Sequence, residues 1–140
     1  MPTLERNSRR TTQPYERFQA WVASHELALK IYECTKGWPT EERYGLTSQA
    51  RRAAFSVAAN ICEGSARPGP NEFRRFLDIS LASLTELAYI IRIAADLKYL
   101  RSEQRTELEI LRDHTHRLVW GLQRAVAKRA KGPPPLRPSA

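Results

Sequence analysis

The stretch that decides the fold is residues 71–98, NEFRRFLDISLASLTELAYIIRIAADLK. Its apolar residues recur every three or four positions, which is the period of a helix with a buried face. Asn71 is a favourable N-cap, and Glu72 suits the positive end of a helix. At a rise of 1.5 Å per residue, this helix is about 40 Å long. We expect its core face to span about 140° and to comprise Phe73, Phe76, Leu77, Leu81, Leu84, Leu87, Ala88 and Ile91.

Three further segments have the helical period, namely residues 18–36, 44–63 and 102–131, and no segment alternates convincingly with period two. In the first of them we expect the stripe Phe18, Trp21, Ala28 and Tyr32 to face the core. Gly64 is well placed as the C-cap of the second helix.

Short connections make consecutive helices antiparallel neighbours. The sequence therefore predicts an all-α fold, an up-down-up-down antiparallel four-helix bundle over residues 18–131. Residues 1–17 are predicted to form a flexible basic arm, and the proline-rich residues 132–140 a disordered tail.

The composition excludes several classes of protein. The chain has 140 residues, a formal net charge of +8 and 41% hydrophobic residues, which is too apolar for a wholly disordered chain. No apolar run approaches the roughly 18 residues that span a bilayer, so no membrane association is expected. The two cysteines show no CxxC spacing, and a reducing cytoplasmic location is the simple interpretation.

Motifs of catalysis are incomplete in this chain. His25-Glu26 begins a pattern like HExxH, but Leu29 stands where the second zinc ligand belongs. His114 and His116 are two residues apart, which places them on different sides of a helix, so they do not share a metal. We therefore expect a protein that is not an enzyme and that has no metal or cofactor.

A polar seam on the second helix lies between two apolar zones. It comprises Gln49, Arg52, Ser56, Asn60 and Glu63, and Arg51 is grouped with them as a candidate structural or partner contact. If the seam is covered, its groups must form a closed hydrogen-bond network, because buried unpaired charges are costly. Glu72 and Glu86 of the third helix are candidate partners. Three interpretations stay open: an exposed solvated face, a structural or subunit contact, and a contact with a ligand or RNA.

The third helix carries a second aliphatic stripe outside its core arc. This stripe comprises Ile79, Ile90, Ile93 and Leu97. Since a monomeric bundle needs only one apolar stripe per helix, the second stripe predicts self-association. The alternative is that the third helix is buried centrally within its own bundle.

Positive charge gathers at the ends of the chain. The last predicted helix ends with Arg124, Lys128, Arg129 and Lys131, and Arg6, Arg9, Arg10 and Arg17 lie in the arm. These groups are candidates for contact with nucleic-acid phosphates. A solvated, solubilising terminus is the alternative. With no aromatic residues between 123 and 131, any such binding would be weakly sequence-specific.

Several motifs resemble those of the four-helix bundle family of 23S rRNA intervening-sequence proteins. They are Tyr44-Gly45-Leu46, Gln49-x-Arg51-Arg52-Ala53-Ala54 and Asn60-x-x-Glu63-Gly64, followed by Glu72-Phe73 and Glu86-Leu87. The resemblance covers about residues 18–100. The departures are Cys62, Ala82 and Trp38, where the family usually has Ala, Gly and Phe.

The resemblance implies a cytoplasmic bacterial protein that assembles into a ring, with a pentamer known in the family. It also implies kinship with the accessory variability protein of diversity-generating retroelements, a basic pentameric barrel that binds nucleic acid. The family's signature residues, which carry no assigned catalytic role, are Arg51, Arg52, Asn60, Glu63 and Glu72. We thus expect a non-enzymatic oligomer that binds RNA or another nucleic acid; the alternative is a scaffold for a polypeptide partner.

Overall fold

The computed structural model describes residues 12–131, and within them the chain forms four long helices and no strand. The helices are α1 (Gln19–Thr35), α2 (Leu46–Ser65), α3 (Pro70–Asp96) and α4 (Ser102–Lys131). Two short 3₁₀ helices accompany them, η1 (Pro14–Arg17) before α1 and η2 (Thr40–Glu42) before α2.

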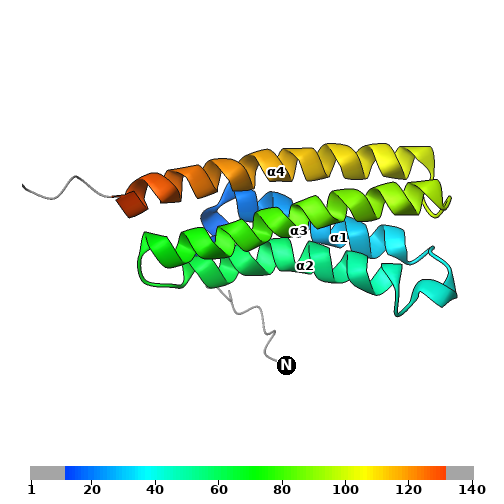
Figure 1. The fold of residues 1–140 in the computed structure, drawn as a ribbon, viewed down its shortest axis with the longest axis horizontal. Coiled ribbons are helices and arrows are strands. Elements are labelled where there is room, and N and C mark those ends of the chain that lie inside the picture. Colours follow the sequence, from blue (N-terminus) through cyan, green and yellow to red (C-terminus); the bar gives the residue numbers. More distant parts are fainter. Residues whose placement is uncertain (1–11, 132–140) are drawn as a thin grey trace, which may run out of the picture.

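The four helices form the predicted antiparallel bundle, which Figure 1 shows side-on. α1 packs against α2 and α4, and α3 also packs against α2 and α4. The predicted all-α four-helix bundle is therefore confirmed. Each predicted helix boundary lies within two residues of the observed one, because glycine, proline and capping residues mark most of the ends.

The core face of α1 differs from the predicted stripe. Leu27 and Ile31 are 0% and 1% exposed, whereas Tyr32 of the predicted stripe is exposed and its other members, Phe18, Trp21 and Ala28, are half-buried against the edge of the core. Helix α1 is apolar over two adjacent faces, and the bundle buries the face that holds the smaller and aliphatic side chains. The hydroxyl of Ser24, which is fully buried, donates to the carbonyl of Ala20 at 2.6 Å, so the buried face carries no unpaired hydroxyl there.

Gly64 lies inside α2 rather than at its C-cap, because the helix continues to Ser65. The residue is buried where α2 crosses α3. A Cβ atom at this position would lie 2.8 Å from Cβ of Phe76 and 2.9 Å from Cδ1 of Phe73. Only glycine therefore permits this close approach of the two helices.

Helix α3 ends in a Schellman motif without glycine. Lys98 adopts the left-handed conformation, with φ of 67°. Its amide donates to the carbonyl of Ala95 at 3.0 Å, and the amide of Tyr99 donates to the carbonyl of Ala94 at 2.8 Å. This turn directs the chain into α4.

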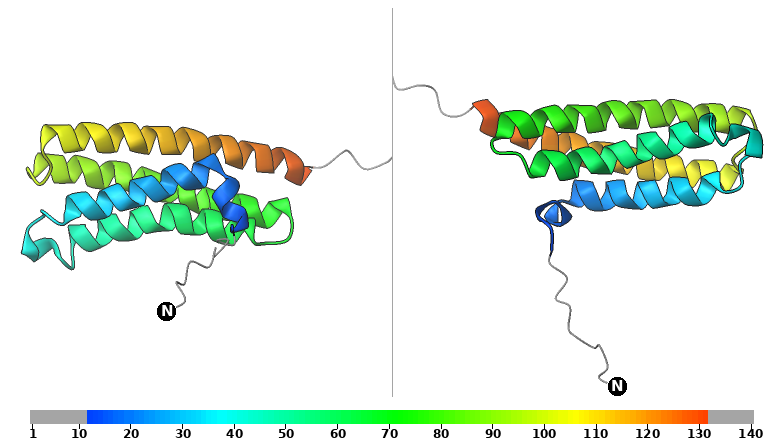
Figure 2. Two further views of the ribbon diagram at one scale, coloured as in Figure 1. Left: turned by 180° about the vertical axis from the view of Figure 1, so that it is seen from behind. Right: turned by 90° about the horizontal axis from the view of Figure 1, so that it is seen from below.

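The last four residues of the predicted flexible arm are structured. They form η1, which packs against α1 and α2, and the ring of Tyr15 lies 4.8 Å from that of Trp21. The views in Figure 2 show η1 at the end of the bundle where α1 begins and α2 ends. Residues 1–11 and the predicted tail, 132–140, lie outside the described residues.

Candidate functional site

The charge of the bundle is concentrated at one end. The up-down topology brings together residues 12–21, 60–76 and 121–131, which hold eight arginines and lysines against three glutamates. The other described residues, 22–59 and 77–120, hold eleven cations and eleven anions. We call the first set the basic end. Asp78 borders it, since its carboxylate accepts a hydrogen bond of 3.0 Å from Gln123 Nε2, and with Asp78 counted the end still holds most of the positive excess of the described residues. Its cations are Arg17, Arg67, Arg74, Arg75, Arg124, Lys128, Arg129 and Lys131.

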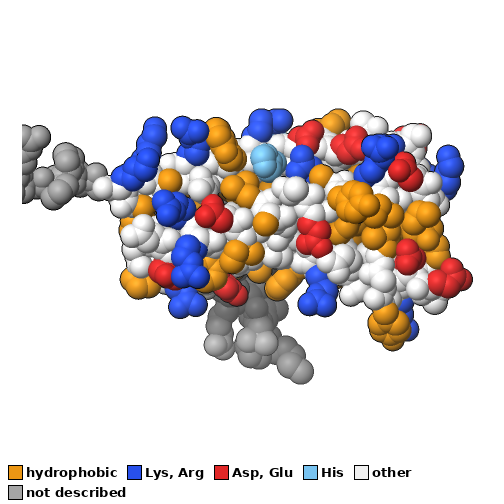
Figure 3. Space-filling model, in the orientation of Figure 1, with side chains coloured by type: hydrophobic (Ala, Val, Ile, Leu, Met, Phe, Trp, Pro, Cys, Tyr) orange, Lys and Arg blue, Asp and Glu red, His pale blue; other side chains and the backbone are white. Residues whose placement is uncertain are grey.

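Four of these cations were predicted from the sequence of the last helix. Arg124, Lys128, Arg129 and Lys131 are all exposed in the last ten residues of α4, and Figure 3 shows basic side chains gathered there. The guanidinium of Arg124 lies 4.7 Å from the ring centroid of Trp120. Arg6, Arg9 and Arg10 of the predicted arm lie outside the described residues.

The other contributors to the basic end come from elsewhere in the chain. Arg67 lies in the α2–α3 loop, and Arg74 and Arg75 lie in the first turns of α3. These three arginines were not predicted as part of the site. Residues 71–100 hold as many acids as bases, and Glu72 and Asp78 stand close to Arg74 and Arg75 in the sequence.

A hollow of about 180 Å³ opens in the basic end, where η1, the α2–α3 loop, α3 and α4 meet. We call it the arginine hollow, because Arg17, Arg67 and Arg129 line it. Its apolar wall includes Phe18 and Phe73, whose rings meet edge to face with centroids 5.7 Å apart. No carboxylate of residues 12–131 lies within salt-bridge distance of the three guanidinium groups.

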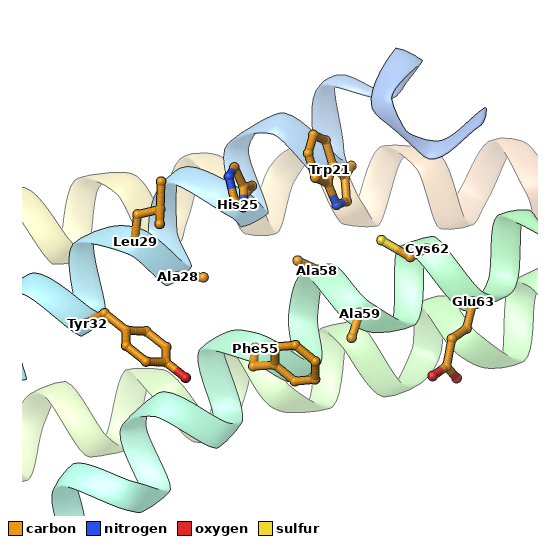
Figure 4. Close-up of a pocket in the computed structure, with 10 residues that line it drawn as sticks. All are labelled: Trp21, His25, Ala28, Leu29, Tyr32, Phe55, Ala58, Ala59, Cys62 and Glu63. Carbon is orange, nitrogen blue, oxygen red and sulfur yellow. The ribbon is translucent and has the colours of Figure 1, made fainter. Parts of the chain in front are cut away.

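A larger, mostly apolar groove of about 510 Å³ runs between the outer faces of α1 and α2. Figure 4 shows its walls, with Trp21, His25, Leu29 and Tyr32 on α1 and Phe55, Ala59 and Cys62 on α2. Leu29 is 58% exposed and Phe55 64% exposed. The ring of His25 stacks on that of Trp21 with centroids 5.0 Å apart. The predicted core stripe of the first helix thus forms one wall of an open groove.

The groove contains a thiol but no arrangement typical of covalent catalysis. Burial raises the pKa of the Cys62 thiol above its ordinary value, which disfavours the reactive thiolate. Cys34 is buried in the core, and burial raises the pKa of its thiol too. Among residues 12–131, no three side chains of His, Cys, Asp or Glu lie close enough together to hold a metal ion.

Part of the predicted polar seam joins α2 to α3. Asn60 Nδ2 donates to the Ser56 carbonyl at 2.8 Å, and the Ser83 hydroxyl donates to the Ser56 hydroxyl at 2.8 Å. Gln49 Nε2 donates to the carboxylate of Glu86, one of the two partners suggested by the sequence. Two of these contacts, the half-buried Ser83–Ser56 bond and the exposed Gln49–Glu86 bond, connect α2 with α3, whereas the Asn60 bond lies within α2.

The rest of the predicted seam is distributed differently. Arg51 faces α1, where its Nε donates to the hydroxyl of Thr35 at 2.9 Å. Arg52 and Glu63 are exposed. Glu72 forms an ion pair of 3.4 Å with Arg75 of its own helix and does not reach the seam. The seam is therefore not one closed network.

The predicted second stripe of α3 is not a single surface. Ile90 is 3% exposed and packs in the core of its own bundle, so its assignment to an oligomer interface is wrong for this structure. The helix is rotated relative to the predicted arc, which brings Ile90 toward α2. Ile79 and Leu97 are 48% and 50% exposed, and Ile93 is half-buried.

None of the helices in the described residues combines the length and the low polarity that crossing a bilayer requires.

Comparison with solved structures places the fold among known bundles. The chain superposes with a TM-score of 0.69 on the crystal structure of a protein of unknown function, from the S23 ribosomal protein family of Bacteroides thetaiotaomicron VPI-5482. The two are 22% identical over 75% of this chain and 95% of that one, a likeness that shows the fold alone. A comparison with curated proteins found no match. The family model described as 23S rRNA-intervening sequence protein matches residues 16–121, and the chain belongs to that family.

Proposed function

We propose that this protein binds RNA or another nucleic acid through the basic end of its bundle and has no catalytic role. The observation that supports the proposal is the charge separation, since most of the positive excess of residues 12–131 lies at one end. Six of the eight cations there are arginines, whose planar guanidinium group matches the geometry of phosphate. We expect the protein in the cytoplasm, where its two free thiols stay reduced.

The proposed binding has a defined salt dependence. If a single strand places about five phosphates on the basic end, counterion release gives a slope of about −3.5 in a plot of log K against log salt. Affinity then falls about 100-fold between 50 and 200 mM salt. Binding by stacking on the groove's aromatic rings would depend far less on salt.

Filter binding of a radiolabelled RNA over a salt series tests this proposal. The double variant Arg124→Gln/Lys128→Gln should weaken binding and reduce the slope by about 1.4, that is, about 0.7 per lost phosphate contact. The matched control is Lys36→Gln/Arg43→Gln, which removes two exposed charges from the opposite, neutral end. Absence of binding at low salt, or equal losses in the two variants, contradicts the proposal.

The α1–α2 groove favours a second function, the assembly of several copies of this chain. Large exposed side chains such as Leu29, Tyr32 and Phe55 are unusual on a monomer when they gather in one groove. Ile79 on α3 and Leu97 at its C-cap are two further exposed apolar side chains. A groove that receives apolar side chains from a different face of the next copy makes a heterologous contact, and such contacts form a ring when the rotation between copies closes and a filament when it does not. The family resemblance implies five copies.

Light scattering at micromolar concentration tests assembly through the groove. Phe55→Glu should yield monomers, whereas Ile110→Glu should not, although Ile110 on α4 is equally exposed at 65%. A wild-type monomer refutes self-association. If Phe55→Glu instead leaves the assembly intact, the groove is free to bind a polypeptide partner, as in the alternative scaffold function.

A further inference from the structure

The arginine hollow differs from the rest of the basic end in its shape. Four segments that are distant in sequence meet around it, with one arginine each from η1, the α2–α3 loop and α4. Among the other cations, Arg124, Lys128 and Lys131 line a second hollow of about 200 Å³, but all three project from α4 alone, so this second hollow is not enclosed by several segments. Gly69 also lines the hollow, and a Cβ atom there would have no neighbour within 4 Å, so the space above the loop is open.

Two of the three arginines of the hollow lie over aromatic rings, and none of the three pairs with a carboxylate of residues 12–131. The guanidinium of Arg17 lies 5.1 Å from the centroid of Phe18, and that of Arg67 lies 5.4 Å from the centroid of Phe76. Contact with a ring face orients the planar group and leaves its N–H donors free for an anion. Three such groups together suit an anion with more than one negative charge.

We propose that the arginine hollow binds the terminal phosphate of a nucleic-acid strand. A terminal phosphomonoester carries a charge of about −1.5 to −2 at neutral pH, because its second pKa is about 6. An internal phosphodiester carries one negative charge. It is also linked to a sugar on each side, so the site would need two openings through which the strand continues. A small hollow of about 180 Å³, with Phe18 and Phe73 in its wall, suits a phosphate group at the end of a strand. The inference rests on the proposed nucleic-acid binding and adds a preference for strand ends.

The decisive comparison uses the full chain and three RNA oligonucleotides of one sequence, with a 5′-phosphate, a 3′-phosphate or hydroxyl groups at both ends. We expect one phosphorylated form to bind at least about tenfold more tightly than the hydroxyl form, since charge-assisted bonds to arginine are strong. The preferred form identifies which end enters the hollow. Inorganic phosphate should compete with that form and not with the hydroxyl form.

Two variants assign the preference to the hollow. Arg67→Gln should abolish the preference for the phosphorylated strand. Lys128→Gln should instead weaken the binding of all three oligonucleotides by the same factor. The preference should also decline below pH 6, as the terminal phosphate loses its second charge. Circular dichroism spectra of both variants check that the bundle remains folded.

The possible failures of the two proposals differ. Equal, salt-sensitive binding of all three oligonucleotides overturns the end preference and leaves the proposed function standing. A preference that survives Arg67→Gln also overturns the assignment to the hollow. No binding of any oligonucleotide at low salt overturns both proposals.

Discussion

Replacing Gly64 by alanine should destabilise the bundle, although alanine is the better helix former. The added Cβ atom would lie 2.8 Å from Cβ of Phe76 and 2.9 Å from Cδ1 of Phe73, well inside the 3.5–4.0 Å of an ordinary carbon contact. Phe76 Cβ is attached to the backbone of α3, so it does not rotate away and the two helices must separate. Such overpacking costs about 1–3 kcal/mol.

The net change follows from two opposing terms. Alanine in place of glycine inside a helix gains about 1 kcal/mol. Taking the upper part of the overpacking range, because a backbone shift is needed, we expect a net loss of about 2 kcal/mol in the free energy of unfolding. For a bundle of this size, that loss lowers the melting temperature by about 6–10 °C.

Gly121 provides the matched control, since it also lies inside a helix but has nothing within 4 Å of a built Cβ atom. Gly121→Ala should therefore raise the stability by up to about 1 kcal/mol. Thermal and urea unfolding followed by circular dichroism measure both changes. A Gly64→Ala variant as stable as the wild type, or changes of the same sign in the two variants, would refute the argument from close helix packing.

Three further predictions concern stability. Lys98→Gly should stabilise the chain by about 1 kcal/mol in urea unfolding, because a left-handed residue with a side chain is strained; no change would show that the turn is unstrained. Ile90→Ala should cost about 2–5 kcal/mol, whereas Ile79→Ala should stay within about 0.5 kcal/mol, and equal melting temperatures would contradict the observed burial. The hydrogen bond between Lys30 and Glu107, 2.8 Å long, raises the pKa of the lysine and lowers that of the carboxyl. The pair therefore stabilises the fold fully between pH 4.5 and 10.5; its contribution is lost as the pH falls through the lowered pKa of Glu107 or rises through the raised pKa of Lys30. Glu107→Gln should flatten the pH dependence of urea unfolding in low salt, and an unchanged profile would show that the pair contributes nothing.

The helices and their antiparallel order were predictable because local signals determine them. Gly37, Pro39 and Pro70 stand at or next to helix ends, and the apolar period is strong in α3. Which side of a helix faces the core is harder to predict. In a helix with two adjacent apolar faces, the residues of either face recur with the helical period, so the period does not choose between them. The large aromatic side chains of Trp21 and Tyr32 made their face of α1 the predicted core face. Packing against α2 and α4 instead buries the face that contains Leu27.

Five of the eight cations of the basic end were predicted from the sequence, and the topology identifies the other three. Counting charges along the chain finds Arg17 and the last turns of α4, but within residues 71–100 Arg74 and Arg75 are balanced by nearby acids. Once the up-down order is accepted, the signal is present in the sequence. The start of the first and third helices and the end of the second and fourth must share one end, so their charges should be summed together. The arginine hollow could not be predicted in this way, because it depends on the path of the α2–α3 loop.

If the basic end binds a strand as proposed, the charge separation along the bundle also determines the orientation of the molecule on that strand. The cations lie at one end of the long axis, and the α1–α2 groove lies on the side of the bundle. A copy that contacts RNA through its basic end would therefore leave the groove accessible to another copy. Rotational symmetry would then carry every tip to the same rim of a closed ring. Such a ring would present a continuous circle of positive charge to a strand, and its affinity for the strand would increase with the number of subunits in contact.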